Sequence, residues 1–69
     1  MTLKEKTRFV REELEMTQRE FAKLIGSNQT EVSFIERGFI PEDFRKIQVI
    51  NLMFDLQIKG ANDEQSKNM

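Results

Sequence analysis

Residues 17–38 read TQREFAKLIGSNQTEVSFIERG, and the helix start and stop signals in this stretch decide the fold. A Thr-x-x-Glu capping box opens the stretch, and Gly26 stands where a helix commonly ends. Asn28 is a favourable N-cap for a second helix, which another glycine closes. The stretch therefore predicts two short helices, over residues 18–25 and 29–37, separated by a three-residue break.

Three positions in this stretch constrain how the two helices cross. Ala22 offers a side chain small enough for close approach, Gly26 takes the turn, and Val32 fills the gap between the helices. Two helices joined by a turn that contains glycine form a helix-turn-helix. The residues expected to face the interior are Phe21, Ala22, Leu24, Ile25, Val32 and Ile35.

The segment before this unit predicts a further helix from Leu3 to Glu15. It opens with another Thr-x-x-Glu capping box, at Thr2. Its apolar stripe has the spacing of one helical face and consists of Leu3, Thr7, Val10 and Leu14.

The segment after the unit predicts a helix that starts at Pro41, because proline is tolerated at the first helical position and two acidic residues follow it. This helix is apolar on two sides. One stripe contains Phe44, Ile47, Ile50 and Phe54, and the other contains Val49, Leu52, Met53 and Leu56. Two interpretations stay open: both stripes enter one core, or residues 44–58 form the interface of a homodimer.

The end of the chain gives weaker signals. Residues 57–60 lack the pattern of a fifth helix, and the alternation of Phe54, Leu56 and Ile58 is also compatible with a short strand pairing across a dimer. Residues 60–69 are polar and are expected to form a disordered tail. The predicted organisation is one all-α domain over residues 1–59, followed by this tail.

Composition excludes several function classes. The chain has 69 residues and contains neither cysteine nor histidine, which removes disulfides, thiolate metal sites and the usual general base. We expect no enzyme activity, no metal or other cofactor and no small-molecule ligand. The sequence has no apolar run long enough to span a bilayer and no secretory signal, so a soluble, cytoplasmic protein is expected. The net charge of −1 is mild evidence against nucleic-acid binding, although positive charge on one face would suffice.

Residues 17–38 resemble the Cro/repressor (Xre-type) helix-turn-helix of lambdoid phage regulators. The resemblance extends back through Val10 and Arg11 and, more loosely, forward to Leu56. It implies a lambda-repressor-like domain of four or five helices that binds double-stranded DNA, usually a palindromic operator, as a homodimer.

The resemblance also implies roles for individual residues. Gln29, Thr30 and Ser33 point toward base edges, and a Gln29 amide can pair with adenine N6 and N7 in the major groove. The implied phosphate contacts are Gln18, Arg19, Arg37 and Arg11. Arg11 and Glu36 match an ion pair that ties the first helix to the end of the third. The competing interpretation is that these polar residues are merely solvated, which applies most to the lone charges of Arg19 and Arg37.

Three features depart from the family pattern, one of which is that residues 47–56 fit the family's fourth helix only with a one-residue gap. Phe34 occupies a position that is usually polar in the family and close to DNA. It is expected at a base edge, against a thymine methyl or the sugar backbone, or else packed on Phe39 or a partner subunit. The loop of residues 38–41 is apolar where relatives often carry lysine or arginine for phosphates.

The sequence therefore predicts a sequence-specific DNA-binding transcriptional regulator, a repressor of the phage or mobile-element type, that reads the major groove with residues 29–37. The alternative is an antitoxin or protein-inhibitor module that uses the same fold to bind a protein partner.

Overall fold

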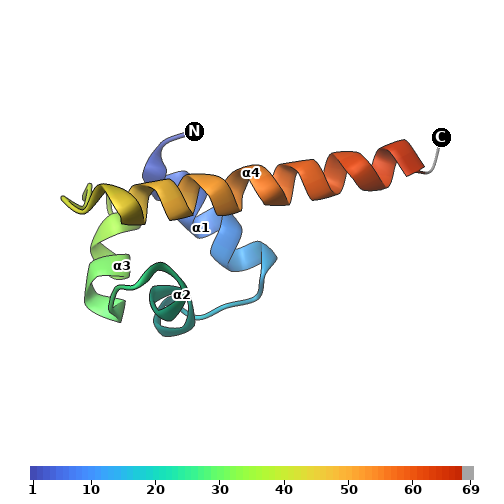
Figure 1. The fold of residues 1–69 in the computed structure, drawn as a ribbon. Helices are drawn as coiled ribbons and strands as arrows, with labels where there is room; N and C mark the ends of the chain where they lie inside the picture. Colours follow the sequence, from blue (N-terminus) through green and yellow to red (C-terminus); the bar gives the residue numbers. More distant parts are fainter. Residues whose placement is uncertain (68–69) are drawn as a thin grey trace.

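The structure, a computed structural model that describes residues 1–67, contains four helices and no strand within that range. They are α1 (Leu3–Glu13), α2 (Gln18–Ile25), α3 (Gln29–Ile35) and α4 (Phe44–Lys67). Figure 1 shows that α4 runs alongside α1 and continues beyond the other three helices. The molecule is accordingly elongated, with extents of 42 × 21 × 18 Å. The all-α fold predicted from the sequence is confirmed.

Local capping explains where the first three helices begin. The hydroxyls of Thr2 and Thr17 accept hydrogen bonds from the amides of Glu5 and Glu20, and both glutamates return a bond to the capping residue. The side chain of Asn28 accepts from the Glu31 amide at 2.8 Å. All three predicted starts are therefore confirmed, because each depends on residues within one turn.

The same three helices also end alike. After each helix one residue adopts a positive φ, and these residues are Glu15, Gly26 and Gly38, with φ of 55°, 72° and 113°. The following amide then donates to a carbonyl five residues back, as Met16 does to Arg11 at 2.9 Å. The turn at Glu15 ends α1 at Glu13, two residues before the predicted end, and leaves Thr17 extended to cap α2. By the same means α3 ends at Ile35 rather than Arg37.

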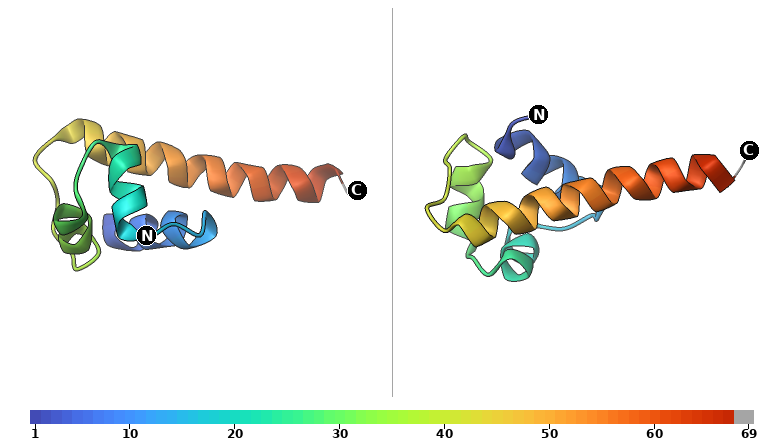
Figure 2. Two further views of the ribbon diagram at one scale, coloured as in Figure 1. Left: turned by 90° about the horizontal axis from the view of Figure 1, so that it is seen from below. Right: turned by 45° about the horizontal axis from the view of Figure 1, so that its top comes forward.

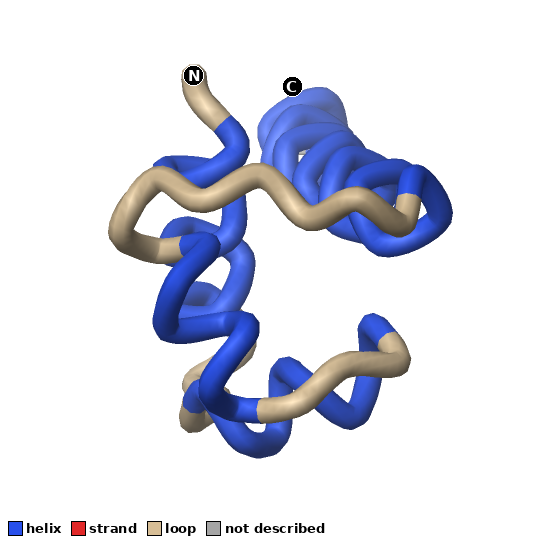
Figure 3. Tube along the Cα trace, turned by 90° about the vertical axis from the view of Figure 1, so that its left-hand side faces the viewer, coloured by secondary structure: helices blue, strands red, loops and turns tan. Residues whose placement is uncertain are grey.

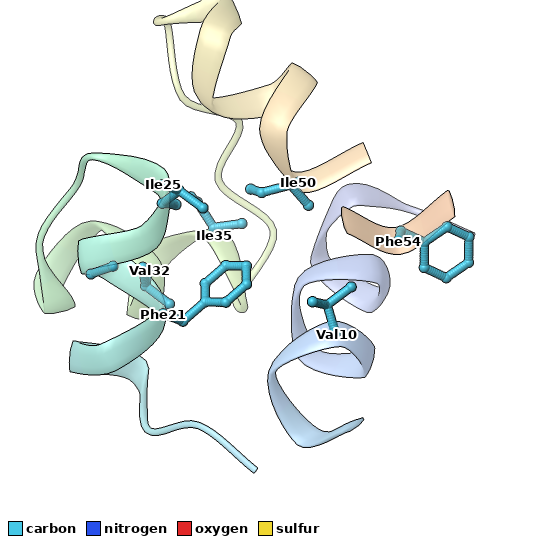
Figure 4. Packing of buried hydrophobic residues seen from close by; sticks show 8 residues of the cluster. Val10, Phe21, Ile25, Val32, Ile35, Ile50 and Phe54 are labelled. Atoms are coloured by element: carbon cyan, nitrogen blue, oxygen red, sulfur yellow. The ribbon is translucent and has the colours of Figure 1, made fainter. Parts of the chain in front are cut away.

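The core lies between α1, the α2–α3 pair and the first half of α4 (Figure 4). Ala22 is 2 % exposed and Val32 is fully buried, so both predicted crossing positions are confirmed. Among the residues whose burial the structure describes, the buried core cluster consists of Val10, Phe21, Ala22, Ile25, Val32, Ile35, Ile50 and Phe54. Figure 2 shows α2 lying across the direction of α1 and α4, which lets the short helix pair close one side of this core.

For two residues the prediction of a core position is wrong. Leu24 is 52 % exposed and Leu14 is 39 % exposed. In α2 the buried side is centred between Phe21 and Ile25, and Leu24 lies about 100° away from Ile25 around the helix. Leu14 caps α1 where the chain turns away. Phe9, which was not among the predicted core residues, packs against the core, and its ring meets that of Phe54 edge to face at 5.5 Å.

The start of α4 also differs from the prediction. The helix begins at Phe44 and not at Pro41, which is buried in the preceding loop. Asp43 caps the helix, because its carboxylate accepts from the Arg45 amide at 3.0 Å and its carbonyl accepts from the Lys46 amide. Figure 3, which looks along α4, shows the loop from α3 spanning this end of the molecule before α4 begins.

The C-terminal segment continues α4 through Gly60 to Lys67, where a disordered tail was expected. Gly60 costs about 1 kcal/mol relative to alanine inside a helix, which is too little to stop one that is already formed. The described residues therefore contain neither the fifth helix nor the short strand considered from the sequence. Residues 68–69 of the expected tail lie outside the described residues.

Candidate nucleic-acid interface

The candidate interface is built on the α2–α3 pair. Val32 and Ile35 pack α3 into the core, which leaves the opposite side of this seven-residue helix facing outward. Gln29 and Thr30 are exposed on that side, and Ser33 is half-buried. The helix thus presents short polar side chains on a rigid support, as a major-groove reading helix does.

Six predicted site residues come together in one shallow hollow of about 400 Å³, which we call the reading hollow. Its lining residues are Gln18, Gln29, Thr30, Ser33, Phe34 and Arg37. Gln18 comes from the first turn of α2, and Arg37 follows the end of α3. The hollow therefore combines amide and hydroxyl groups suited to base edges with one cation suited to a phosphate.

A second hollow of about 440 Å³, the basic hollow, lies where the end of α2 meets the start of α3. Arg19 and Lys23 contribute its two cations, and Gln29 and Thr30 line both hollows. Lys23 and Asn28 were missed as candidate site residues. Lys23 was detectable, because it stands four residues after Arg19 and so shares a helical face with it.

Positive charge flanks α3 instead of lying on it. No basic residue occurs within Gln29–Ile35, whereas exposed Arg19, Lys23 and Arg37 stand on its two sides. A net charge of −1 is therefore compatible with positive charge beside α3, the distribution that binding to phosphates would require.

Arg11 and Glu36 form the ion pair expected from the sequence. Arg11 donates from Nε to Glu36 Oε2 at 2.7 Å and from its terminal nitrogen to Oε1 at 3.0 Å, so the pairing is bidentate. The other terminal nitrogen of Arg11 donates to the Met16 carbonyl at 3.1 Å. Each guanidinium nitrogen of Arg11 thus makes a hydrogen bond within the protein, and the structure does not bring Arg11 into either hollow.

Gln18 joins the same network. Its side-chain amide donates to Glu36 Oε1 at 3.4 Å, which ties the first turn of α2 to the end of α3. The Glu36 side chain is only 3 % exposed, and Arg8 approaches it at 3.7 Å. Burial by itself would raise the pKa of Glu36, but the hydrogen bond and charge of Arg11, the bond from Gln18 and the charge of Arg8 outweigh it and lower the pKa.

This network predicts a loss of stability in acid. Because the pKa of Glu36 is lowered in the folded state, its stabilising contribution is complete above the ordinary carboxyl pKa of 4.5 and is lost as the pH falls through the folded value. The unfolding free energy of the wild type should therefore drop below about pH 4.5, as measured by urea denaturation between pH 3 and pH 7. In a Glu36→Gln variant the unfolding free energy should depend less on pH over that range. If it depended on pH as in the wild type, the acid sensitivity could not be assigned to Glu36.

A second ion pair connects α3 to α4 and was missed from the sequence. Lys46 donates to Glu31 Oε1 at 2.6 Å, and the Ser27 hydroxyl bonds the same oxygen. Both bonds lower the pKa of Glu31. Because Glu31 is in the first turn of α3, this contact holds α3 against α4 close to Gln29 and Thr30.

Other site types find no support in residues 1–67. No three acidic side chains are grouped so as to hold a metal ion. None of the helices has the length and apolar character needed to cross a membrane.

Comparison with known proteins agrees with this geometry. The family model HTH_3, described as helix-turn-helix, matches residues 8–43, which is slightly more than half of the chain. This range contains α2, α3, both hollows and the Arg11–Glu36 pair. No curated protein and no solved structure matches the chain significantly. The chain belongs to the Cro/repressor (Xre-type) family of helix-turn-helix DNA-binding regulators.

Proposed function

We propose that the protein is a homodimeric transcriptional repressor, of the kind carried by phages and other mobile elements, that binds a palindromic operator. The observation that carries the proposal is the reading hollow, in which Gln29, Thr30 and Ser33 lie beside Arg37. An amide and two hydroxyls can bond base edges while the guanidinium neutralises a phosphate, so one surface supplies both selectivity and affinity. The cations of the basic hollow extend the phosphate contacts along the backbone.

Gln18 has two routes to phosphate, and the contacts favour one of them. Its side-chain amide already donates to Glu36, whereas the amides of the first helical turn of α2 have no partners within the helix. We therefore assign the phosphate contact of Gln18 to its backbone N–H. We assign Arg11 to holding Glu36, and through it Gln18, in position.

Selection of bound sites from random double-stranded DNA tests the proposal directly. The expected result is an enriched site with two inverted half-sites whose centres are about 34 Å, or one helical turn, apart. Enrichment of a single half-site would contradict the homodimer. No enrichment at all would contradict sequence-specific DNA binding and favour the antitoxin or inhibitor alternative. The selected site, placed across a promoter that drives a reporter, should lower expression if the protein is a repressor.

The exposed apolar face of α4 supports self-association. Leu52 and Leu56 are 59 % and 58 % exposed, and Val49 and Met53 beside them are half-buried. Leu52 and Leu56 are spaced as one helical stripe and face away from buried Ile50, whereas Val49 and Met53 also pack against the core. The same apolar residues on α4 of a second copy of the chain could cover these side chains, because apolar faces of two helices commonly pack together in symmetric dimers.

Replacing Leu56 by glutamate should convert the dimer to a monomer. A charge in the centre of an apolar helix interface has no partner, whereas on an exposed monomer surface it costs little. Sedimentation equilibrium should report half the wild-type mass, and affinity for the complete operator should fall toward that for one half-site. Leu24→Glu is the matched control, because Leu24 is similarly exposed but lies on α2. A dimeric Leu56→Glu variant would contradict this interface.

A further inference from the structure

Phe34 is a large aromatic residue at the edge of the polar reading hollow. Its side chain is 46 % exposed, whereas Val32 and Ile35 on the same helix are fully buried. It lines the hollow together with Gln29, Ser33 and Arg37. Phe34 belongs neither to the buried core cluster nor to the partly buried residues packed against it, so core packing does not account for an apolar side chain in this position.

The ring of Phe34 is held in place from two sides. The Phe39 ring meets it edge to face at 6.4 Å, and the Arg37 guanidinium lies 5.7 Å from its centre. The backbone turn brings these neighbours together, because the amides of Arg37 and Phe39 both donate to the Phe34 carbonyl. Gly38, at a φ of 113°, makes this turn possible. The exposed part of the ring is therefore preorganised and does not need to be ordered on binding.

The major groove offers one apolar group that matches such a surface. Among the four bases only thymine carries a C5-methyl group there, next to the acceptors and donors that Gln29, Thr30 and Ser33 can bond. We propose that Phe34 is a specificity-determining residue that reads the C5-methyl group of a thymine in each half-site. This inference rests on the proposed function of the reading hollow.

The spacing along α3 separates this methyl group from the base that Gln29 reads. Phe34 follows Gln29 by five residues, which is a rise of about 7.5 Å along the helix. That distance exceeds the separation of stacked base pairs, about 3.4 Å. The thymine read by Phe34 therefore belongs to a different base pair from the adenine read by Gln29. Arg37, against the ring, is positioned to bond the phosphate on the same side.

Replacing thymine by deoxyuridine tests the proposal without altering any hydrogen-bonding group. Each thymine of the selected site is exchanged in turn, and affinity is measured by fluorescence anisotropy with the full chain. Wild-type affinity should fall about fourfold per half-site at one thymine position, the loss expected for one buried methyl group. With Phe34→Ala the thymine and uracil sites should bind equally. Phe34→Leu should keep part of the difference, and Leu24→Ala, an exposed apolar residue outside both hollows, should keep all of it.

Several outcomes would overturn the proposal. They are a wild-type protein indifferent to uracil at every position, a selected site without thymine, and a uracil penalty that persists undiminished in Phe34→Ala. The last result would assign the methyl contact to another residue and leave Phe34 to the sugar backbone or the partner subunit. The comparison of thymine and uracil sites uses the wild-type protein, so it does not depend on whether any variant folds. Failure of the proposed function is distinguishable, because no DNA site would then be enriched at all.

Discussion

Replacing Gln29 by alanine is expected to remove most of the discrimination between the operator and a site in which the adenine it reads is changed. A bidentate amide–adenine pair is worth about 1–3 kcal/mol, so the affinity ratio should shrink about fivefold to 150-fold. Gln29 is exposed and has no side-chain partner among the described contacts, so thermal stability should stay nearly unchanged. Fluorescence anisotropy with both sites, together with a thermal melt, measures the two quantities.

Arg37→Ala is the matched control for this experiment. Arg37 belongs to the same hollow but is assigned to phosphate, so its loss should weaken binding to all sequences alike. The slope of log affinity against log salt should also become shallower by about one unit. If Gln29→Ala kept the wild-type ratio between the two sites at moderate salt, the assignment of Gln29 to a base would be wrong.

Replacing Arg11 by alanine should cause a large loss of stability. Glu36 is 3 % exposed, and without Arg11 its carboxylate keeps only the long bond from Gln18 and the distant charge of Arg8. Breaking a buried ion pair from one side costs about 3–5 kcal/mol. We expect about 3 kcal/mol, since Arg11 itself is 21 % exposed. That is a substantial part of the roughly 5–15 kcal/mol typical of a whole domain.

Urea denaturation at pH 7 measures this loss. The pair formed by Arg45 and Asp43 at 3.5 Å provides a control, because Arg45 is 88 % exposed and Arg45→Ala should cost less than about 1 kcal/mol. DNA binding by Arg11→Ala should weaken as well, because Glu36, no longer fixed by Arg11, holds Gln18 less firmly in position. An Arg11→Ala protein as stable as Arg45→Ala would show that the pair contributes nothing beyond a surface contact.

The helix-turn-helix was predictable from the sequence because its signals are local. Each N-cap and its amide partner lie within three residues, and the turn at Gly26 depends on one residue that tolerates a positive φ. The start of α4 was predicted less well. The sequence pointed to Pro41 as the first helical residue, and only the observed hydrogen bonds identify Asp43 as the cap.

The candidate site was predictable in part. The resemblance implied Gln29, Thr30 and Ser33, and the structure brings these residues together in the reading hollow, on the side of α3 opposite buried Val32 and Ile35. Their role as base contacts stays a prediction. The bond from Lys46 to Glu31 was not predicted, because it joins residues 15 positions apart, on two helices whose relative placement the sequence does not state.

The amino-acid pattern by itself determined the four helix starts to within three residues, the crossing of α2 on α3, and the polar character of the reading surface. Tertiary structure alone decided which side of α4 is buried. Both stripes of that helix are apolar, and a hydrophobic pattern identifies faces that can be buried without specifying which one meets a partner. Packing against α1 selects Ile50 and Phe54 and leaves Leu52 and Leu56 exposed. The same holds for Phe34, whose ring faces the reading hollow because the turn at Gly38 brings Phe39 against it.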